Sequence, residues 1–198
     1  MADSNLLNRA ARCYLRAGER AEAARCFTAA GAHHPAAEQY VQLGLHREAA
    51  DAYAAAGTYD FAIWQLAHHV GDVAAARALE RFGRSRAGGA ERLRWRLALA
   101  RCDVVDHRPE SGPLGVLADA CAYLDRPVGY ADGHVESWAV AVAESMGRED
   151  QVASIYAACV RGRIPGAADR WAAWSWKVLQ CELILPAAEP SSADSPTR

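Results

Sequence analysis

The chain has 198 residues, of which 52% are apolar and 23% charged, and its formal net charge is -2. This length allows one large domain or two small ones, and the composition is that of a soluble globular protein. The near-neutral balance argues neither for nor against a charged partner, and no apolar run reaches the roughly 18 residues that a membrane span needs. Because an export signal is missing and the six cysteines form no CxxC pair, we expect a cytoplasmic protein that binds no membrane.

The first part of the chain repeats with a period of 26 residues: Glu22 to Gly31 reads EAARCFTAAG and Glu48 to Gly57 reads EAADAYAAAG. Three triplets share the spacing, namely Tyr14, Tyr40 and Leu66; Phe27, Tyr53 and Leu79; and Gly31, Gly57 and Gly83. Alanine, nearly a quarter of the chain, is the strongest helix former, and glycine is favoured just past a helix end because it lacks a Cβ. Each repeat is therefore predicted to be two helices joined by a tight turn, with Phe27, Tyr53 and Leu79 in equivalent buried positions.

The segments YLRAGERAEAARCFTAAG and YVQLGLHREAADAYAAAG resemble tetratricopeptide-like (TPR-like) α-solenoids over about residues 5–83. They depart from the standard pattern because the period is 26 rather than 34 residues and the usual Trp and Pro are missing. In this respect they are similar to clathrin- or coatomer-type solenoids and to the helical arms of bacterial signalling NTPases. The resemblance implies protein–protein binding, whereas the spacing alone indicates only stacked hairpins.

The repeat marks end at Gly83, and the polar segment RSRAGG (84–89) is the best candidate for a linker. Five further helices are predicted, within residues 91–105, 114–124, 134–147, 148–162 and 168–185. The expected organisation is thus a helical-repeat domain over residues 1–83, a linker over 84–89, an α-helical domain over 90–185 and a disordered, Pro/Ser-rich tail over 186–198.

The last predicted helix carries Trp171, Trp174 and Trp176 on two apolar stripes. Because Trp174 and Trp176 point about 200° apart on an ideal helix, the pattern predicts a helix covered on two sides, with both side chains mostly buried. The alternative is that these tryptophans form an exposed face for a partner, where tryptophan is enriched.

The stretch from Arg77 to Arg101 contains eight arginines and two glutamates, which gives it a net charge of +6. This asymmetry predicts contact with an acidic protein surface, or else a linker between solvated helix faces. The candidate partner contacts in and beside the linker are Arg84, Arg86, Arg92, Arg94 and Arg96. Nucleic-acid binding through the same run is a weaker alternative, because the overall charge is not basic and no recognition motif is present.

Two constellations could bind a metal ion. His46, His69 and Asp72 are expected on one edge of adjacent repeats and could hold zinc, although turn-exposed histidines are the simpler interpretation. Asp103, Asp106 and His107 fall at i, i+3 and i+4 and could hold a divalent cation or act as a catalytic pair, although a solvated helix end is commoner.

The sequence contains no GxSxG, HExxH or GxxxxGK[ST] motif, so hydrolase, zincin and P-loop signatures are absent. We therefore predict an all-α, non-enzymatic protein without cofactor or metal: TPR-like stacked antiparallel hairpins followed by a C-terminal helical bundle. Its expected function is to bind another protein, through an acidic surface or a helical or extended peptide. It would act as an adaptor or regulatory subunit of a larger bacterial assembly, such as an NTPase signalling or defence system. The alternatives are a metal-dependent enzyme using Asp103, Asp106 and His107, and a nucleic-acid-binding module using the Arg77–Arg101 run.

Overall fold

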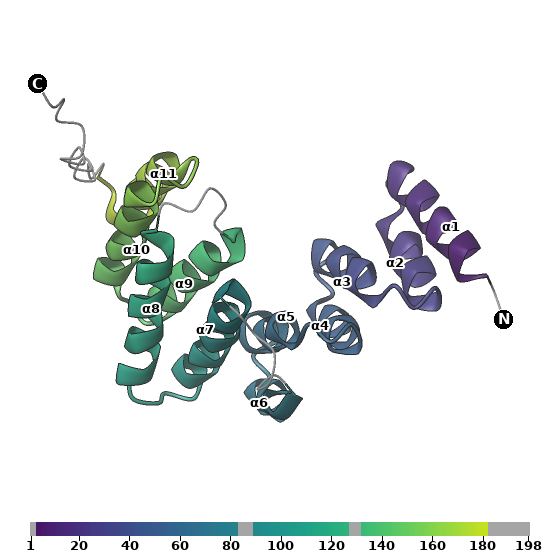
Figure 1. Ribbon diagram of the computed structural model, residues 1–198, viewed down its shortest axis with the longest axis horizontal. Coiled ribbons are helices and arrows are strands. Elements are labelled where there is room, and N and C mark those ends of the chain that lie inside the picture. The colour runs from purple at the N-terminus through teal and green to yellow at the C-terminus, as the bar shows by residue number, and fades with distance from the viewer. Residues whose placement is uncertain (1–2, 83–88, 127–131, 182–198) are drawn as a thin grey trace, which may run out of the picture. The chain divides into compact units, whose positions relative to one another are not determined.

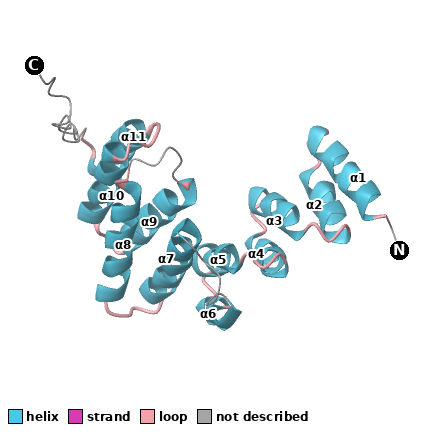
Figure 2. Cartoon of the chain, viewed as in Figure 1, coloured by secondary structure: helices cyan, strands magenta, loops and turns pink. Residues whose placement is uncertain are grey.

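A computed structural model describes residues 3–82, 89–126 and 132–181 (Figures 1 and 2). These residues form helices and contain no strand, which confirms the all-α class for the described part of the chain. The elements are α1 (Ser4–Arg16), α2 (Arg20–Ala29), α3 (His33–Gln42), α4 (His46–Ala55), α5 (Tyr59–Trp64), the π-helical turn η1 (Gln65–Val70), α6 (Val73–Ala78), the 3-10 turn η2 (Glu80–Phe82), α7 (Gly89–Val105), α8 (Ser111–Leu124), α9 (Gly133–Ser145), α10 (Glu149–Arg161) and α11 (Ala167–Leu179).

The chain divides into two compact units, Met1–Val116 and Leu117–Arg198, and the division falls inside α8. Helix α7 belongs to the first unit, where it packs on α5 and α6. The sequence instead placed this helix in the C-terminal domain. Of the predicted linker, residues 84–89, only Gly89 is described, as the first residue of α7, and the predicted tail, residues 186–198, lies outside the described residues. The predicted domain boundaries therefore stay a prediction.

In the first unit, helices α1 to α5 each pack on their neighbours along the chain (Figure 1). One cluster of buried side chains holds Ala11, Ala23, Phe27 and Ala36, and the next holds Ala37, Ala49, Ala52, Tyr53 and Ala62. Small alanines let the helices approach closely, and one aromatic ring per cluster fills the remaining space. Phe27 and Tyr53 are 6% and 5% exposed, as predicted, whereas Leu79 is only half-buried.

The turns of the repeat are made by glycines at equivalent positions. Gly18, Gly31, Gly44, Gly57 and Gly71 all have φ between 72° and 83°. A residue with a Cβ adopts this left-handed conformation only with strain, so the glycines end each helix where the sequence pattern predicts.

A hydrogen bond between hairpins also follows the repeat. Arg20 Nη1 donates to Gln39 Oε1 at 3.0 Å, and His46 Nδ1 lies 2.9 Å from Gln65 Oε1. Each bond joins residues 19 apart, and both glutamines are buried, at 8% and 5% exposure. Because a buried amide without a partner destabilises the fold by about 1–3 kcal/mol, these bonds help to fix how one hairpin seats on the next.

In the second unit, α10 packs on α9 and α11. Trp171 and Trp174 are buried at 4% and 7% exposure, but Trp176 is 64% exposed. The prediction that Trp174 and Trp176 are both buried is therefore wrong for Trp176. Helix α11 buries the face that carries Trp171, Trp174 and Ser175, and Trp176 projects from another side. The helix also ends at Leu179, before the predicted end, with Gln180 at a φ of 55°.

Candidate functional site

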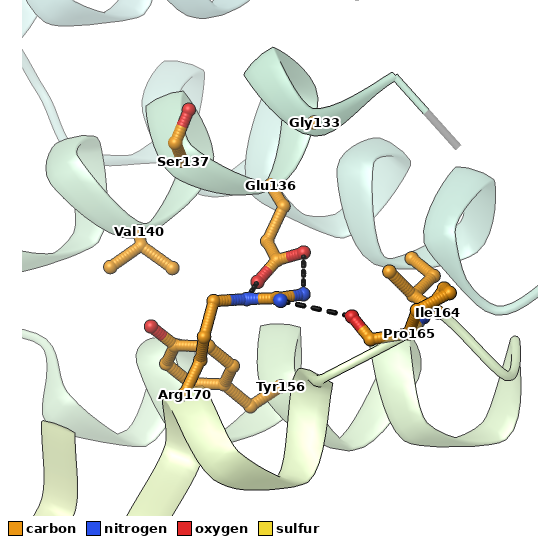
Figure 3. Close-up of a pocket in the computed structure, with 8 residues that line it drawn as sticks. All are labelled: Gly133, Glu136, Ser137, Val140, Tyr156, Ile164, Pro165 and Arg170. Carbon is orange, nitrogen blue, oxygen red and sulfur yellow. Dashed lines mark hydrogen bonds and ion pairs between the residues drawn. The ribbon is translucent and has the colours of Figure 1, made fainter. Parts of the chain in front are cut away.

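The second unit contains a pocket of about 510 Å³ (Figure 3). Helix α9 contributes residues of its first two turns, including Glu136, and α10 contributes Tyr156. The loop after α10 contributes Ile164 and Pro165, and the first turn of α11 contributes Arg170. The volume lies within the range of small-ligand and peptide-anchor sites, and both apolar and polar side chains line it.

A bidentate ion pair between Arg170 and Glu136 forms the polar part of the pocket (Figure 3). Arg170 donates from Nε to Glu136 Oε1 at 2.6 Å and from Nη2 to Glu136 Oε2 at 2.7 Å. A third bond runs from Arg170 Nη1 to the carbonyl oxygen of Pro165 at 3.0 Å. Glu136 is only 6% exposed, and a buried carboxylate requires such a partner. The hydrogen bonds with Glu136 also raise the pKa of Arg170, so the guanidinium stays charged.

Tyr156 supplies a hydroxyl group that has no hydrogen-bond partner among the described residues. The residue is 7% exposed, and its hydroxyl makes no hydrogen bond to the described residues. No fully enclosed side-chain oxygen of the described chain lacks a partner, so this hydroxyl retains some exposure, and Tyr156 itself lines the pocket. Burial, followed by the charge of Glu136, raises the pKa of Tyr156 to about 12. The hydroxyl therefore keeps its proton and can donate it to a ligand at neutral pH.

The buried cysteines Cys102 and Cys159 are poorly suited to act as nucleophiles. Burial raises the pKa of Cys102 to about 11, and burial together with Glu136 raises the pKa of Cys159 still further. Since the thiolate is the reactive form, both groups are inert at neutral pH. The pocket is thus equipped to bind through hydrogen bonds and apolar contact.

The predicted arginine contacts fall into three groups. Arg84 and Arg86 lie outside the described residues, and Arg92 and Arg96 are exposed on α7. Arg94 instead donates from Nε to Asp60 Oδ2 at 2.8 Å, and its guanidinium carbon lies 5.1 Å from the centre of the Phe61 ring. The Arg94 and Asp60 side chains are 14% and 5% exposed, so the charge of Arg94 is balanced inside the first unit.

The predicted tryptophan contacts are also separated by the fold. The rings of Trp171 and Trp174 stack with centroids 5.5 Å apart, and Trp174 Nε1 donates to Glu144 Oε1 at 2.7 Å. Both are buried in the core of the second unit, whereas the exposed Trp176 keeps a surface suited to contact. Whether any predicted residue binds a partner stays a prediction.

Neither metal constellation has its ligands free. His46 and His69 do lie together, with rings stacked 4.1 Å apart, but Asp72 accepts from Arg47 at 2.8 Å and from the Ala75 N–H at 3.0 Å.

Asp103 and Asp106 share Arg77, which approaches them at 2.7 and 3.0 Å, and His107 is exposed. Among the described residues, no group of three or more His, Cys, Asp or Glu side chains is placed to hold a metal ion.

Helix α1 has an exposed face whose equivalent on α3 is covered by another helix of the repeat. Ala32, which precedes α3, and Ala36 and Tyr40 on α3 belong to or pack against the cluster around Phe27 of α2. The residues 26 positions earlier on α1 are Leu6, Ala10 and Tyr14; Leu6 is 62% exposed and Tyr14 39%. Cys13, at the position equivalent to the buried Gln39, is exposed as well.

Comparisons of this chain with models of known protein families, with curated proteins and with solved structures found no match. No helix among the described residues is long and apolar enough to cross a membrane. Sequence reasoning missed Glu136, Tyr156 and Arg170. They stand on three different helices, and no local motif joins them.

Proposed function

We propose that the chain is a protein-binding module, an adaptor or regulatory subunit of a larger bacterial assembly. TPR-like stacked hairpins form its first part, and a C-terminal helical bundle forms its second. The stacking is supported by the packing of α1 to α5 on their chain neighbours and by the repeated Arg20–Gln39 and His46–Gln65 bonds. Stacked repeats present long surfaces that recognise other proteins.

The observation that carries this proposal is the open face of α1, defined by Leu6, Ala10, Cys13 and Tyr14. The equivalent face of α3 is covered by α2, a helix of small residues with one aromatic side chain. The internal repeat therefore indicates the kind of partner that fits on α1: a helix rich in small residues that places one large side chain against Tyr14.

The charges beside this face further restrict the partner. Arg9, Arg12 and Arg16 are exposed on α1, whereas the equivalent positions of α3 carry Pro35, Glu38 and Gln42. Two copies of α1 facing each other would bring like charges together, which disfavours a symmetric dimer through this face. We therefore infer a helix of another protein, rich in small residues and carrying acidic side chains.

Cross-linking at Cys13 tests this proposal in the full-length chain. Cys13 and Cys181 are both exposed, so a photo-activated cross-linker can be attached at Cys13 in a Cys181→Ser variant and at Cys181 in a Cys13→Ser variant. Each is mixed with extract of the source organism, and the cross-linked peptides are identified by mass spectrometry. We expect the Cys13 probe to capture an acidic, alanine-rich helix that the Cys181 probe does not capture.

A second pair of variants tests the apolar contact. Leu6→Glu should reduce the cross-linked product about tenfold or more, because it removes a buried apolar side chain from the interface. Leu45→Glu changes a leucine of 41% exposure away from α1 and should leave the product unchanged. Equal capture by both probes, no capture at Cys13, or a second copy of this chain as the product would each overturn the proposal.

A further inference from the structure

The pocket of the second unit has hydrogen-bond donors to spare. Arginine has five N–H donors. The bonds to Glu136 and Pro165 use three of those on Arg170, which leaves two without an acceptor among the described residues. The Tyr156 hydroxyl adds a further donor, whereas both carboxylate oxygens of Glu136 are bound by Arg170. A ligand that matches this site must present acceptors.

The charge of the pocket favours an uncharged acceptor. The carboxylate of Glu136 and the guanidinium of Arg170 cancel within one ion pair. An anion would be repelled by Glu136, and a cation would be repelled by Arg170. A carbonyl group has the required lone pairs without a net charge.

Apolar side chains complete the wall. In Figure 3, Val140 of α9 lies on one side of the Arg170–Glu136 pair, and the Ile164–Pro165 segment after α10 lies on the other. The combination of an apolar wall and unused donors suits a main-chain carbonyl that is followed by an apolar side chain. The volume of about 510 Å³ accommodates more than one residue of this kind.

We propose that this pocket binds an extended peptide segment by an apolar side chain and an adjacent main-chain carbonyl, which accepts hydrogen bonds from Tyr156 and Arg170. Tyr156 carries the inference because it is more than nine-tenths buried, lines the pocket and has no partner among the described residues. The elevated pKa of Tyr156, about 12, keeps the hydroxyl protonated throughout the neutral range. The inference rests on the proposed protein-binding function and extends it to the second unit.

Three small probes that share one apolar body test the chemistry of the ligand. N-acetyl-leucine amide is uncharged, N-acetyl-leucine is an anion, and leucine amide is a cation at neutral pH. Each is titrated into the isotope-labelled full-length chain and followed by nuclear magnetic resonance. The uncharged probe should bind most tightly, with the largest shifts at Tyr156 and Arg170. Equal or tighter binding of either charged probe, or no binding of the uncharged one up to its solubility limit, would overturn the proposal.

A fourth probe separates a peptide from a free small amide. The capped tripeptide N-acetyl-Ala-Leu-Ala-amide presents the same leucine with main-chain carbonyls on both sides. It should bind several-fold more tightly than N-acetyl-leucine amide if the natural ligand is a peptide segment. Equal affinities would refute the peptide as the ligand.

The variant Tyr156→Phe removes the hydroxyl and keeps the ring. Affinity for the uncharged probes should fall about threefold to tenfold, the usual effect of losing one neutral hydrogen bond. Tyr123→Phe, at a half-buried position on α8, is the matched control and should bind as the wild type does. An unchanged affinity of Tyr156→Phe would refute the role of the hydroxyl. Because the pocket and α1 are tested by separate measurements, failure here leaves the cross-linking result at Cys13 intact.

Discussion

Replacing Gly162 by alanine should destabilise the second unit, although alanine is the better helix former. Gly162 follows the last residue of α10 and is buried. Its φ of -72° is open to any residue, so the backbone conformation does not require glycine. The constraint is space, because a Cβ added here would lie 1.9 Å from the carbonyl oxygen of Leu124 and 3.0 Å from its carbonyl carbon.

The magnitude follows from that distance. A Cβ essentially never approaches another heavy atom closer than 3.0 Å, so the ends of α8 and α10 would have to separate by about 1 Å. The obstacle is backbone, and Leu124 is itself only 1% exposed, so no flexible side chain can move aside. Overpacking of this kind destabilises by about 1–3 kcal/mol and sometimes more, while the gain in helix propensity is at most about 1 kcal/mol. Because the obstacle is backbone, the loss should lie in the upper part of this range, and we expect a net loss of about 1–2 kcal/mol.

Gly115 provides the matched control. It lies within α8, its φ is not positive, and a Cβ there would meet nothing within 4 Å. Gly115→Ala should therefore stabilise the protein by about 0.5–1 kcal/mol. Both variants are compared with the wild type by urea titration, followed by far-ultraviolet circular dichroism and tryptophan fluorescence. A Gly162→Ala variant as stable as the wild type or Gly115→Ala would refute the close contact between α8 and α10.

Two further predictions concern charged groups. Asp60→Asn should lower the free energy of unfolding by about 3–5 kcal/mol, because it removes the charge of a carboxylate that is 5% exposed and pairs with the largely buried Arg94. Asp125→Asn, in a pair whose side chains are 42% and 50% exposed, should change the free energy of unfolding by less than about 1 kcal/mol in the same titration. Burial, with a smaller effect of neighbouring histidines, lowers the pKa of His69 to about 4 from 6.5. As the pH falls, the unfolded chain is protonated at this histidine before the folded protein is, so the free energy of unfolding should decrease between pH 6.5 and 4. The variant His69→Gln should reduce this dependence on pH. An unchanged dependence in the variant would contradict the prediction.

The helices of the first unit could be read from the sequence because their determinants are local. Glycines recur at the positions that end helices, and alanines with one aromatic residue recur on the face that is buried. Leu79 departs from the pattern because the third repeat differs in both of its helices. In the first helix, η1 replaces α-helix before Gly71, and the second helix, α6, has only six residues.

The polar contacts between helices were beyond sequence reasoning because their partners lie far apart in the chain. Gln39 and Gln65 occupy equivalent positions, which was the one available signal, but their partners Arg20 and His46 differ in chemistry. The pocket shows the same difficulty more strongly. Glu136 and Arg170 are 34 residues apart, and no sequence motif marks Tyr156 as part of the same site.

The exposure of Trp176 shows that burial cannot be predicted from the apolar pattern of a single helix. Two apolar stripes on a helix predict two covered faces only if two neighbouring elements are present to cover them. In the second unit, α11 packs on α10 and buries Trp171 and Trp174, and Trp176 stays 64% exposed. The apolar stripe is a property of the α11 sequence, but whether the stripe is buried depends on which other helices pack against α11.

The arginine run makes the related point for charge. Its net charge of +6 counts only residues between Arg77 and Arg101, whereas the fold brings carboxylates from elsewhere in the chain to the same place. Asp60 neutralises Arg94, and Asp103 and Asp106 together bind Arg77. The charge that a partner meets on this surface is therefore smaller than the charge of the segment. Mutations that probe an acidic partner belong at exposed positions of α7, because a change at Arg94 would test the stability of the first unit instead.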